Sequence, residues 1–321
     1  MALKLRGSMV AMITPFKHDA IDEAAFKRLI DMQVKAGTSA IVPCGTTGES
    51  ATLSYAEHDR VIELAVQAAR GRIPVIAGTG SNNTREAIRI TKHAKQAGAD
   101  AALLISPYYN KPTQRGLFLH YQAISEAVDI PLIIYNIQSR TAVNIEPETF
   151  AQLATLKNVI GVKESSGNLE QMSRILQLTQ DKLTLLSGDD GLTLPVLAIG
   201  GTGVISVAAN LVPGDVAAMV DAALAGRQAE ALRGHQRLLP LVKALFLETN
   251  PIPVKTAMGL LEMIEPGLRL PLCEMSDANQ ARLRDALERY GLLKGAQASS
   301  RQKAARPGPR VGRAGEGGRR S

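Results

Sequence analysis

Short apolar runs recur along the chain at nearly regular intervals. Each run is continuous rather than alternating and is rich in branched residues, which is typical of strands buried on both faces of a parallel sheet. From Val10 to Val204 their mean spacing is about 28 residues, the size of one strand, loop and helix unit. The eight runs lie at residues 10–13, 40–42, 74–77, 101–105, 132–135, 159–162, 183–186 and 204–206.

Amphipathic segments with helix-capping residues lie between these runs. Ser54 and Glu57 have the spacing of a capping box, and Asn83 precedes a similar segment that ends before Gly98. Eight successive strand–helix units predict an α/β fold of the (β/α)8 TIM-barrel type, with an open doubly wound sheet as the alternative. The clearest helices are expected over residues 22–36, 55–70 and 84–97.

Beyond Val204 the pattern becomes helical throughout. Apolar residues at helical spacing predict helices over 216–224, 228–247, 254–263 and 277–290, separated by prolines. Packing and oligomer support are the expected roles of this appendage. We therefore divide the chain into a barrel at 1–210, a C-terminal helical region at 211–294 and a basic tail at 295–321.

The composition is that of an ordinary globular protein, with 45% hydrophobic and 21% charged residues among 321. Most of the net charge of +7 lies at the C-terminus, because residues 301–321 hold seven Lys or Arg and one Glu. The rest of the chain is nearly neutral and contains no Trp, which argues against a basic, aromatic nucleic-acid surface. We expect no nucleic-acid partner and a disordered tail.

Cysteine content and the length of the apolar segments indicate the compartment. Cys44 and Cys273 are too few and too far apart for a disulfide framework or a metal site. The apolar stretch at residues 9–13 is too short for a signal-peptide core, and no run is long enough to span a membrane. The chain is therefore expected to be cytoplasmic, without a membrane partner and without a metal.

Polar residues follow several of the apolar runs, which is where the catalytic groups of a TIM barrel lie. Gly45–Ser50 follows the second run and offers backbone amides that suit a carboxylate. Gly200–Gly203 precedes the eighth run, so it belongs to the opposite face and is discounted as a phosphate loop. The remaining groups are Tyr108 and Tyr109, Tyr135 and Asn136 with Arg140, Lys163 and Glu164, and Gly188–Asp190.

Lys163 is the strongest candidate for a nucleophile. It closes an apolar run, and scarce water destabilises the ammonium form, leaving an amine able to form a Schiff base with a carbonyl compound. The alternative is a buried salt bridge, but adjacent strand residues point to opposite faces, which disfavours pairing with Glu164. Lys255 is a second candidate amine and ranks lower because it lies in the helical region.

Arg140 and a group of hydroxyls complete the predicted site. Most loop arginines are plain surface residues, yet Arg140 beyond the fifth run suits bidentate capture of a substrate carboxylate. Tyr135 needs hydrogen-bonded partners to act as an acid or base near neutrality, and Thr47 with Tyr109 can supply that relay. A lone tyrosine is more often a core aromatic, so it is the convergence with Lys163 that favours catalysis.

Taken together, these motifs resemble the dihydrodipicolinate synthase family, also called 4-hydroxy-tetrahydrodipicolinate synthase, from about Gly7 to Leu293. The family consists of Schiff-base-forming class I aldolases built on (β/α)8 barrels, usually as homotetramers. The resemblance implies a lyase that condenses pyruvate with L-aspartate 4-semialdehyde in the first committed step of diaminopimelate and lysine biosynthesis, without a metal or organic cofactor. The motifs are Gly45–Ser50, Pro107–Asn110, Tyr135–Asn136 with Ser139–Thr141, Gly161–Glu164 and Leu186–Asp189.

The resemblance also implies a role for each matching residue. Lys163 would form the imine with pyruvate, and Tyr135 would shuttle protons. Thr47 and Tyr109 would complete the relay, with Tyr109 reaching in from a neighbouring subunit. Arg140 would guide the carboxylate of the incoming aldehyde and hold Tyr135 in place. Pyruvate would be bound by Thr46, Thr47, Gly188 and the carbonyl of Ile205.

Many bacterial members are inhibited by lysine at a cleft between subunits, and the resemblance implies such a site here. Two positions depart from the family pattern. Tyr55 stands where a second histidine is often found, and Gln138 stands where the strand-five motif usually has proline, which predicts a looser loop around Arg140. The matching positions of the lysine site are Ser50, Ala51, His58, Asn82, Glu86 and Tyr108.

Two alternatives stay open. N-acetylneuraminate lyase and the 2-keto-3-deoxy sugar acid aldolases share the barrel and the lysine, although Arg140 and the pairing of Thr47 with Tyr109 favour the synthase. A barrel without catalysis, which binds a keto acid or serves as a scaffold, is disfavoured by the intact set of Lys163, Tyr135 and Arg140.

Overall fold

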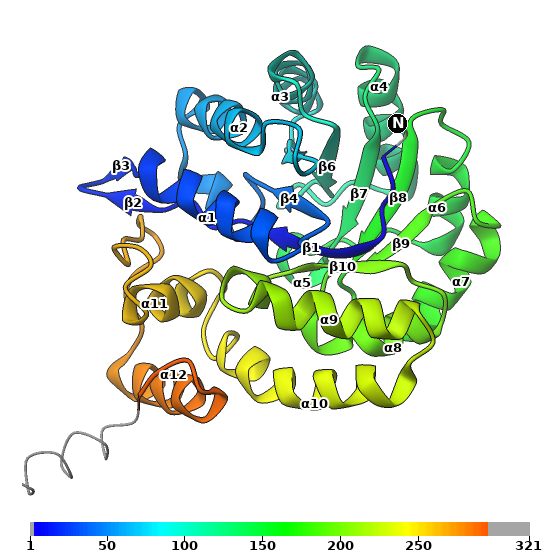
Figure 1. Cartoon of the computed structure of the whole chain (residues 1–321). Helices are drawn as coiled ribbons and strands as arrows, with labels where there is room; N and C mark the ends of the chain where they lie inside the picture. Colours follow the sequence, from blue (N-terminus) through cyan, green and yellow to red (C-terminus); the bar gives the residue numbers. More distant parts are fainter. Residues whose placement is uncertain (1–2, 295–321) are drawn as a thin grey trace, which may run out of the picture.

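The computed structural model describes residues 3–294 and contains an eight-stranded parallel sheet ringed by helices (Figure 1). The sheet order is β4-β1-β10-β9-β8-β7-β6-β5, and a bridge between Ile41 and Val75 links β4 to β5. This nearly closed ring confirms the (β/α)8 barrel and excludes the open doubly wound sheet. Its strands are β1 (Gly7–Ala11), β4 (Ala40–Val42), β5 (Ile76–Gly78), β6 (Ala101–Ile105), β7 (Leu132–Asn136), β8 (Val159–Glu164), β9 (Thr184–Ser187) and β10 (Gly203–Ser206).

Each of the eight apolar runs contains or overlaps one barrel strand, although the bounds shift by a few residues. The first strand begins at Gly7 rather than Val10, because Gly7 already pairs with Gly203 of β10. A Cβ on Gly203 would meet the backbone of Gly7, so a glycine is required at this close approach. Gly200–Gly203 lies at the amino end of β10, away from the polar strand ends, as the sequence indicates.

A short antiparallel hairpin, β2 (Phe16–Lys17) with β3 (Ala20–Ile21), was not predicted. Its turn residues His18 and Asp19 have φ of 50° and 61°, a conformation for which Gly or Asn is the usual sequence signal. The turn therefore carried no recognisable signature.

Helices cover the outside of the barrel, and the two N-terminal caps predicted from the sequence, Ser54 and Asn83, are confirmed. The Ser54 hydroxyl accepts from the Glu57 amide while the Glu57 carboxylate accepts from the Ser54 amide, a complete capping box. Asp22 and Asn83 cap the helices on either side. The barrel helices are α1 (Glu23–Lys35), α2 (Tyr55–Ala69), α3 (Thr84–Ala97), α4 (Gln114–Ala127), α5 (Gln138–Thr141), α6 (Pro147–Leu153), α7 (Leu169–Thr179) and α8 (Thr193–Ala198).

Four further helices follow the last strand. Pro253 falls within the first turn of α11, where a missing backbone N–H is tolerated, and this helix begins two residues before its expected start. In Figure 1, α11 lies near the β2–β3 hairpin and packs on α12. The helices are α9 (Pro213–Leu224), α10 (Gln228–Ala244), α11 (Ile252–Leu260) and α12 (Asp277–Tyr290).

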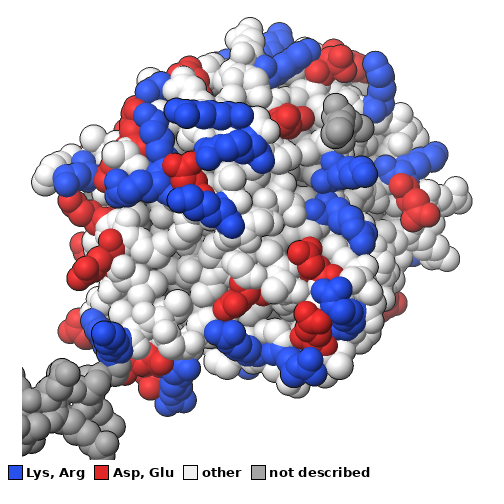
Figure 2. Space-filling model, in the orientation of Figure 1, with Lys and Arg blue, Asp and Glu red and all other residues white. Residues whose placement is uncertain are grey.

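Apolar side chains fill the barrel interior and the layer between sheet and helices. Met9, Leu103 and Ile133 are buried in the interior together with Tyr135. Basic and acidic side chains both occur across the face shown in Figure 2. None of the helices within residues 3–294 is long and apolar enough to cross a membrane. The basic tail predicted at 295–321 lies outside the described residues.

Candidate active site

Lys163 and Tyr135 lie side by side at the carboxyl ends of neighbouring strands. They are paired in register between β8 and β7, and the Lys163 Nζ lies 4.1 Å from the centre of the Tyr135 ring. Both side chains are buried. Parallel pairing thus places the predicted amine against the predicted phenol.

Burial controls the charge of Lys163. Burial and the Arg140 charge lower the pKa of the Lys163 amine while the carboxylate of Asp190 raises it, and the net result is a pKa of about 7. Within the described part of the chain, Lys163 forms no ion pair within 4.0 Å. Glu164 points away, because its carboxylate accepts hydrogen bonds from the Asn136 side chain and the Ser166 amide. A substantial share of Lys163 is therefore neutral and nucleophilic near pH 7.

Burial and polar neighbours shift the pKa of Tyr135 in opposite directions. Burial raises the pKa of its phenol, whereas the hydroxyls of Ser165 and Thr46 and the Arg140 charge lower it. Lys163 and Tyr135 therefore share Arg140 as a neighbouring charge, and this charge favours both the neutral amine and the phenolate.

The turn after β4 carries Thr46 and Thr47. Backbone hydrogen bonds from Gly48 to Gly45 and from Glu49 to Thr46 close the turn, and the Thr14 hydroxyl donates to the Gly48 carbonyl. The Thr47 Oγ1 accepts a hydrogen bond of 2.9 Å from the Asn250 side chain. The turn is thus fixed from the barrel on one side and from the C-terminal helical region on the other.

Arg140 lies on α5, the single turn that follows β7. Its Nη2 donates to the backbone carbonyl of Asn250 over 3.1 Å. Gln138 is the first residue of α5, a position where proline would fit as well, because the amide there needs no helical partner. Arg140 is thus held from outside its own loop.

Gly188 lies directly over the Lys163 side chain. A Cβ built on Gly188 would meet the Ser165 Oγ and would lie 2.9 Å from the Lys163 Cε. Any larger residue would therefore displace the amine. Ile205, in β10, is buried in the barrel interior close to this end of the strands.

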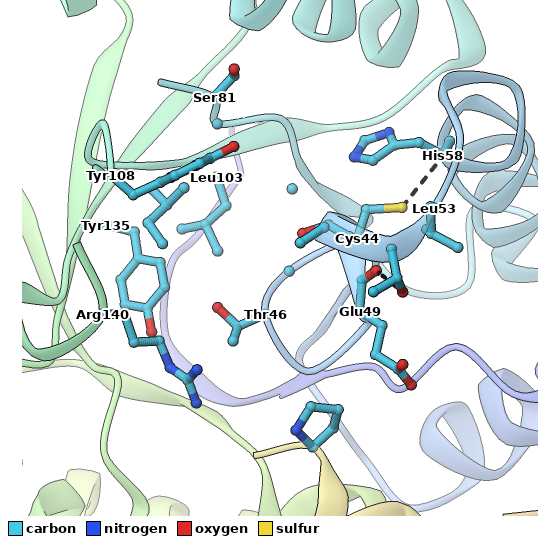
Figure 3. Close-up of a pocket in the computed structure, with 18 of the residues that line it drawn as sticks. Cys44, Thr46, Glu49, Leu53, His58, Ser81, Leu103, Tyr108, Tyr135 and Arg140 are labelled. Carbon is cyan, nitrogen blue, oxygen red and sulfur yellow. Dashed lines mark hydrogen bonds between the residues drawn. The ribbon is translucent and has the colours of Figure 1, made fainter. Parts of the chain in front are cut away.

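A cavity of about 650 Å³ opens beside these residues (Figure 3). Thr46, Tyr135 and Arg140 line one side of it, and Lys163 lies beyond Tyr135, outside the lining. The lining also includes five of the six residues predicted for a lysine site, namely Ser50, Ala51, His58, Glu86 and Tyr108, of which Tyr108 lies beside Tyr135 and His58 lies across the cavity (Figure 3).

The second half of this cavity has its own electrostatic character. Burial lowers the pKa of His58 to about 4, so its imidazole is neutral near pH 7. Hydrogen bonds from Ser81 and Tyr55 lower the pKa of Glu86, which keeps this carboxylate ionised. Asn82 stands behind the lining and donates to the Tyr108 carbonyl. A neutral ring beside a carboxylate suits a ligand that carries an ammonium group.

Tyr109 is not brought into this site by its own chain. Its side chain is 88% exposed and its φ is 75°, in the left-handed region, so it projects from the loop after β6. Among the sequence-predicted catalytic residues, Lys163 and Tyr135 lie together, whereas Tyr109 projects away and the Thr47 hydroxyl contacts Asn250, so that Thr46 rather than Thr47 acts on the Tyr135 phenol.

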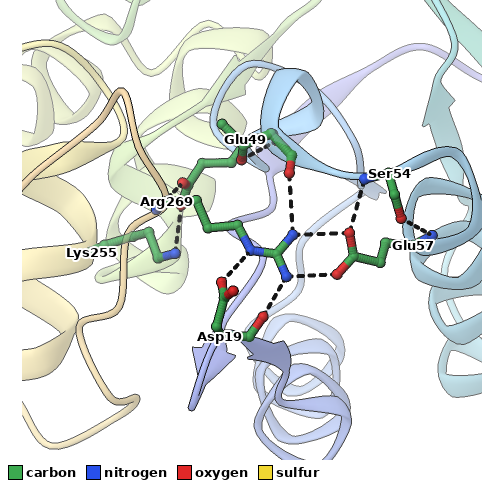
Figure 4. Close-up of polar contacts among 7 residues, drawn as sticks. Asp19, Glu49, Ser54, Glu57, Lys255 and Arg269 are labelled. Carbon is green, nitrogen blue, oxygen red and sulfur yellow. Dashed lines mark hydrogen bonds and ion pairs between the residues drawn. The ribbon is translucent and has the colours of Figure 1, made fainter.

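Lys255, the second candidate amine, is a structural residue. Its Nζ lies 2.5 Å from the Glu49 Oε1, and neither side chain is exposed (Figure 4). Arg269 extends the pairing, since its amide donates to Glu49 and its guanidinium contacts Glu57, Asp19 and the Thr52 carbonyl. This ion-pair network joins the C-terminal helical region to the turn that carries Thr46 and Thr47.

Sequence reasoning missed two residues of the site. Asn250 contacts Thr47 and Arg140, and the only signal was its place before two prolines. Ser165 has a buried hydroxyl with no hydrogen-bond partner among the described residues, and it stood two positions after Lys163. No group of three or more His, Cys, Asp or Glu within residues 3–294 is arranged to hold a metal ion.

Comparison with known proteins places this geometry in a family. Residues 4–290 match the model of the dihydrodipicolinate synthetase family. A 4-hydroxy-tetrahydrodipicolinate synthase from Syntrophobacter fumaroxidans is 56% identical over 289 residues, which covers 90% of this chain and 99% of that protein.

Solved structures agree with the sequence match. A dihydrodipicolinate synthase from Aquifex aeolicus superposes with a TM-score of 0.89 at 52% identity, over 91% of this chain and all of that one. A dihydrodipicolinate synthase from Cyanidioschyzon merolae with lysine bound superposes with a TM-score of 0.86 at 41% identity, over 89% of this chain and 99% of that one.

Proposed function

The chain belongs to the dihydrodipicolinate synthetase family, and on this premise we propose that it is a 4-hydroxy-tetrahydrodipicolinate synthase, a lyase of the class I aldolase type. It condenses pyruvate with L-aspartate 4-semialdehyde, in the first committed step of diaminopimelate and lysine biosynthesis. The observation that carries the mechanism is the buried Lys163 amine, whose pKa is lowered to about 7, placed against Tyr135 at the carboxyl ends of β8 and β7.

The reaction begins with attack of the neutral Lys163 Nζ on the ketone carbon of pyruvate. Water leaves and an imine forms, which acts as the electron sink without a metal or an organic cofactor. Loss of a proton from the pyruvate methyl group gives an enamine, and its carbon attacks the aldehyde carbon of the second substrate. Tyr135 carries protons to and from the reacting oxygen atoms, with Thr46, whose hydroxyl lowers the pKa of Tyr135, as its relay partner in place of the predicted Thr47.

The carboxylates of both substrates have separate partners in this proposal. The turn with Thr46 and Thr47 binds the pyruvate carboxylate, and Gly188 with the Ile205 carbonyl completes the pocket. Arg140 receives the carboxylate of the aldehyde substrate, for which its planar guanidinium is suited. The position of Arg140 on the cavity lining, tied to Asn250, supports this assignment.

Reductive trapping tests the mechanism directly. Borohydride in the presence of pyruvate is expected to fix a pyruvate-derived adduct on Lys163, detected by peptide mass mapping. A Lys163→Met variant serves as the control and is expected to trap nothing. An adduct on Lys255, or none on the folded wild-type protein, contradicts the proposal and favours a keto-acid-binding barrel without catalysis.

The aldehyde partner separates the synthase from related aldolases. Pyruvate consumption is measured with L-aspartate 4-semialdehyde, with N-acetylmannosamine and with sugar-derived aldehydes at equal concentration. Turnover restricted to the first aldehyde is expected. A higher kcat/KM with a sugar aldehyde would move the assignment to the N-acetylneuraminate lyase or sugar-acid aldolase group.

The exposed Tyr109 supports a homotetrameric enzyme in which this phenol completes the relay of a neighbouring subunit. Hybrid oligomers test this arrangement. Lys163→Met and Tyr109→Phe chains are each expected to be nearly inactive alone, and activity returns on mixing, because one kind of site then keeps both groups. Light scattering gives the subunit number, and no recovery in an exchanging mixture refutes the shared site.

Feedback control by lysine is proposed for the far side of the same cavity. The ionised Glu86, the neutral His58 and Tyr108 suit an amino acid with two ammonium groups, and Tyr55 offers a hydroxyl in place of a second imidazole. Initial rates are measured against lysine at constant pyruvate. Inhibition is expected, and an unchanged rate at millimolar lysine contradicts it. We propose the cytoplasm as the site of this reaction.

A further inference from the structure

Ser165 lies just beyond the end of β8, two positions after Lys163. Its backbone amide donates to the Asn136 carbonyl over 2.9 Å, which continues the pairing of β8 with β7 by one residue. Side chains of an extended strand alternate between its two faces, so Ser165 lies on the same face as Lys163 and opposite to Glu164. The end of β8 therefore brings an amine and a hydroxyl to the same side of the barrel mouth.

The surroundings of Gly188 show that these two groups lie close together. A Cβ built on Gly188 would overlap the Ser165 Oγ and would lie 2.9 Å from the Lys163 Cε. The Ser165 Oγ is buried, and it forms no hydrogen bond with any residue in the range 3–294. Most buried hydroxyls in proteins have a hydrogen-bond partner, so a donor without one, placed beside the nucleophile, points to a role in the reaction.

The Tyr135 phenol is the group on which this hydroxyl acts. Burial raises the pKa of Tyr135, whereas the hydroxyls of Ser165 and Thr46 lower it, and Ser165 has the larger effect of the two. A neighbouring hydroxyl lowers the pKa of a phenol by donating to its ionised form. Of the charged groups around the phenol, Arg140 also lowers its pKa, and the Glu164 carboxylate opposes this.

A hydroxyl that is unpaired before the reaction contributes most once charge develops on its neighbour. Hydrogen bonds to an anion are shorter and about twice as strong as those between neutral groups. A contact that tightens only as the phenol loses its proton lowers the reaction barrier without strengthening the binding of substrate. The geometry of Ser165 fits such a contact, because its proton is not committed to any other acceptor in the described chain.

We propose that Ser165 is a positioning residue whose hydroxyl donates to the Tyr135 oxygen and stabilises it as an anion during the reaction. The inference rests on the proposed function and deepens it, because it adds a second donor, beside Thr46, to the proton relay. The phenol gives its proton to the hydroxyl of the adduct between Lys163 and pyruvate, which leaves as water. The resulting phenolate takes a proton from the pyruvate methyl group, so the iminium becomes the enamine and the phenol is restored.

Ser165→Ala removes the hydroxyl without crowding Gly188. We expect kcat to fall about 10-fold, the scale of a lost hydrogen bond to a charged group, with KM for pyruvate within about 2-fold of wild type. Ser165→Cys places a larger but weakly donating group at the same position, so a similar loss is expected. Wild-type kcat in either variant, or a loss confined to KM, would overturn the proposal.

A double-mutant cycle tests whether Ser165 acts through the phenol. With Tyr135→Phe already present, adding Ser165→Ala is expected to lower kcat no further, because the oxygen that accepts from Ser165 is gone. Multiplying losses would overturn the assignment. Ser173→Ala makes the same substitution on the exposed face of α7 and is the matched control, expected to leave kcat unchanged.

Borohydride trapping separates this role from the proposed function. After long incubation with pyruvate, Ser165→Ala is expected to carry as much adduct on Lys163 as wild type, which also shows that the variant is folded. A smaller amount would mean that Ser165 packs Lys163 rather than serving the phenol, and would overturn the proposal. No adduct on the wild-type protein would refute the proposed function, whereas a wild-type adduct with multiplying losses refutes only the role of Ser165.

Discussion

The buried pair of Lys255 and Glu49 allows a quantitative prediction for the C-terminal helical region. The two charged atoms are 2.5 Å apart, and both side chains are fully buried. Replacing Lys255 by methionine keeps most of the side-chain volume and its contact with the Phe16 ring, which lies 4.2 Å from the Nζ. The substitution leaves Glu49 without its cation in surroundings that exclude water.

The expected loss of stability depends on two opposing contributions, the attraction between the two charges and the cost of burying them. At 2.5 Å, an effective dielectric of about 20 gives an attraction of about 7 kcal/mol, most of which is offset by the cost of removing both ions from water. Breaking such a pair on one side leaves the remaining charge uncompensated and costs about 3–5 kcal/mol. We expect this loss for Lys255→Met, and the double variant Lys255→Met with Glu49→Gln is expected to recover about 2 kcal/mol or more.

Urea denaturation at one fixed protein concentration measures the effect, since subunit association also contributes to stability. Lys243→Met, an exposed lysine on α10, is the matched control and is expected to lie within about 0.5 kcal/mol of wild type. The reasoning is that Glu49 becomes an uncompensated buried charge when Lys255 is removed. A loss below about 1 kcal/mol for Lys255→Met, or no recovery in the double variant, would refute it.

Three further predictions concern the site and its supports. If neutral Lys163 is the nucleophile, as proposed, kcat/KM for pyruvate is expected to rise with pH through an apparent pKa of about 7, and a flat profile between pH 5.5 and 8.5 would contradict this. Gly188→Ala places a methyl group against Ser165 and Lys163, so trapped pyruvate is expected to fall at least about 10-fold by mass spectrometry, with partial recovery when Ser165→Ala is added. The Arg269 guanidinium lowers the pKa of Glu57 to about 2, so its contribution is complete above the unfolded pKa and is lost as pH falls through about 2. Arg269→Met is therefore expected to cost about 1–2 kcal/mol at pH 6, roughly half as much at pH 3 and little below pH 2, and a cost independent of pH would contradict the linkage.

The barrel could be predicted because burial on both faces of a parallel strand leaves a continuous apolar run that the sequence displays directly. The same logic located Lys163 and Tyr135, since strand ends in a barrel converge on one face. To predict that the two residues lie together, it was enough to identify two neighbouring strands. The structure pairs them in register, with the Lys163 Nζ 4.1 Å from the Tyr135 ring centre.

Contacts across the length of the chain could not be predicted in this way. Asn250 and Thr47 are 203 positions apart, and Lys255 and Glu49 are 206 apart, so no local spacing links them. Lys255 was a candidate amine because the sequence around a buried lysine is similar whether the lysine is a nucleophile or part of an ion pair. Only the position of its partner carboxylate distinguishes the two.

The attachment of Asn250 to both Thr47 and Arg140 has a consequence for the order of synthesis. Chains emerge from the ribosome beginning at the N-terminus, so all eight barrel strands leave it before residue 250 does. A nascent barrel that already contains Lys163 and Tyr135 still lacks the residue that donates to the Thr47 hydroxyl and accepts from Arg140. These two contacts can therefore form only after the strands have been made, when translation is nearly finished.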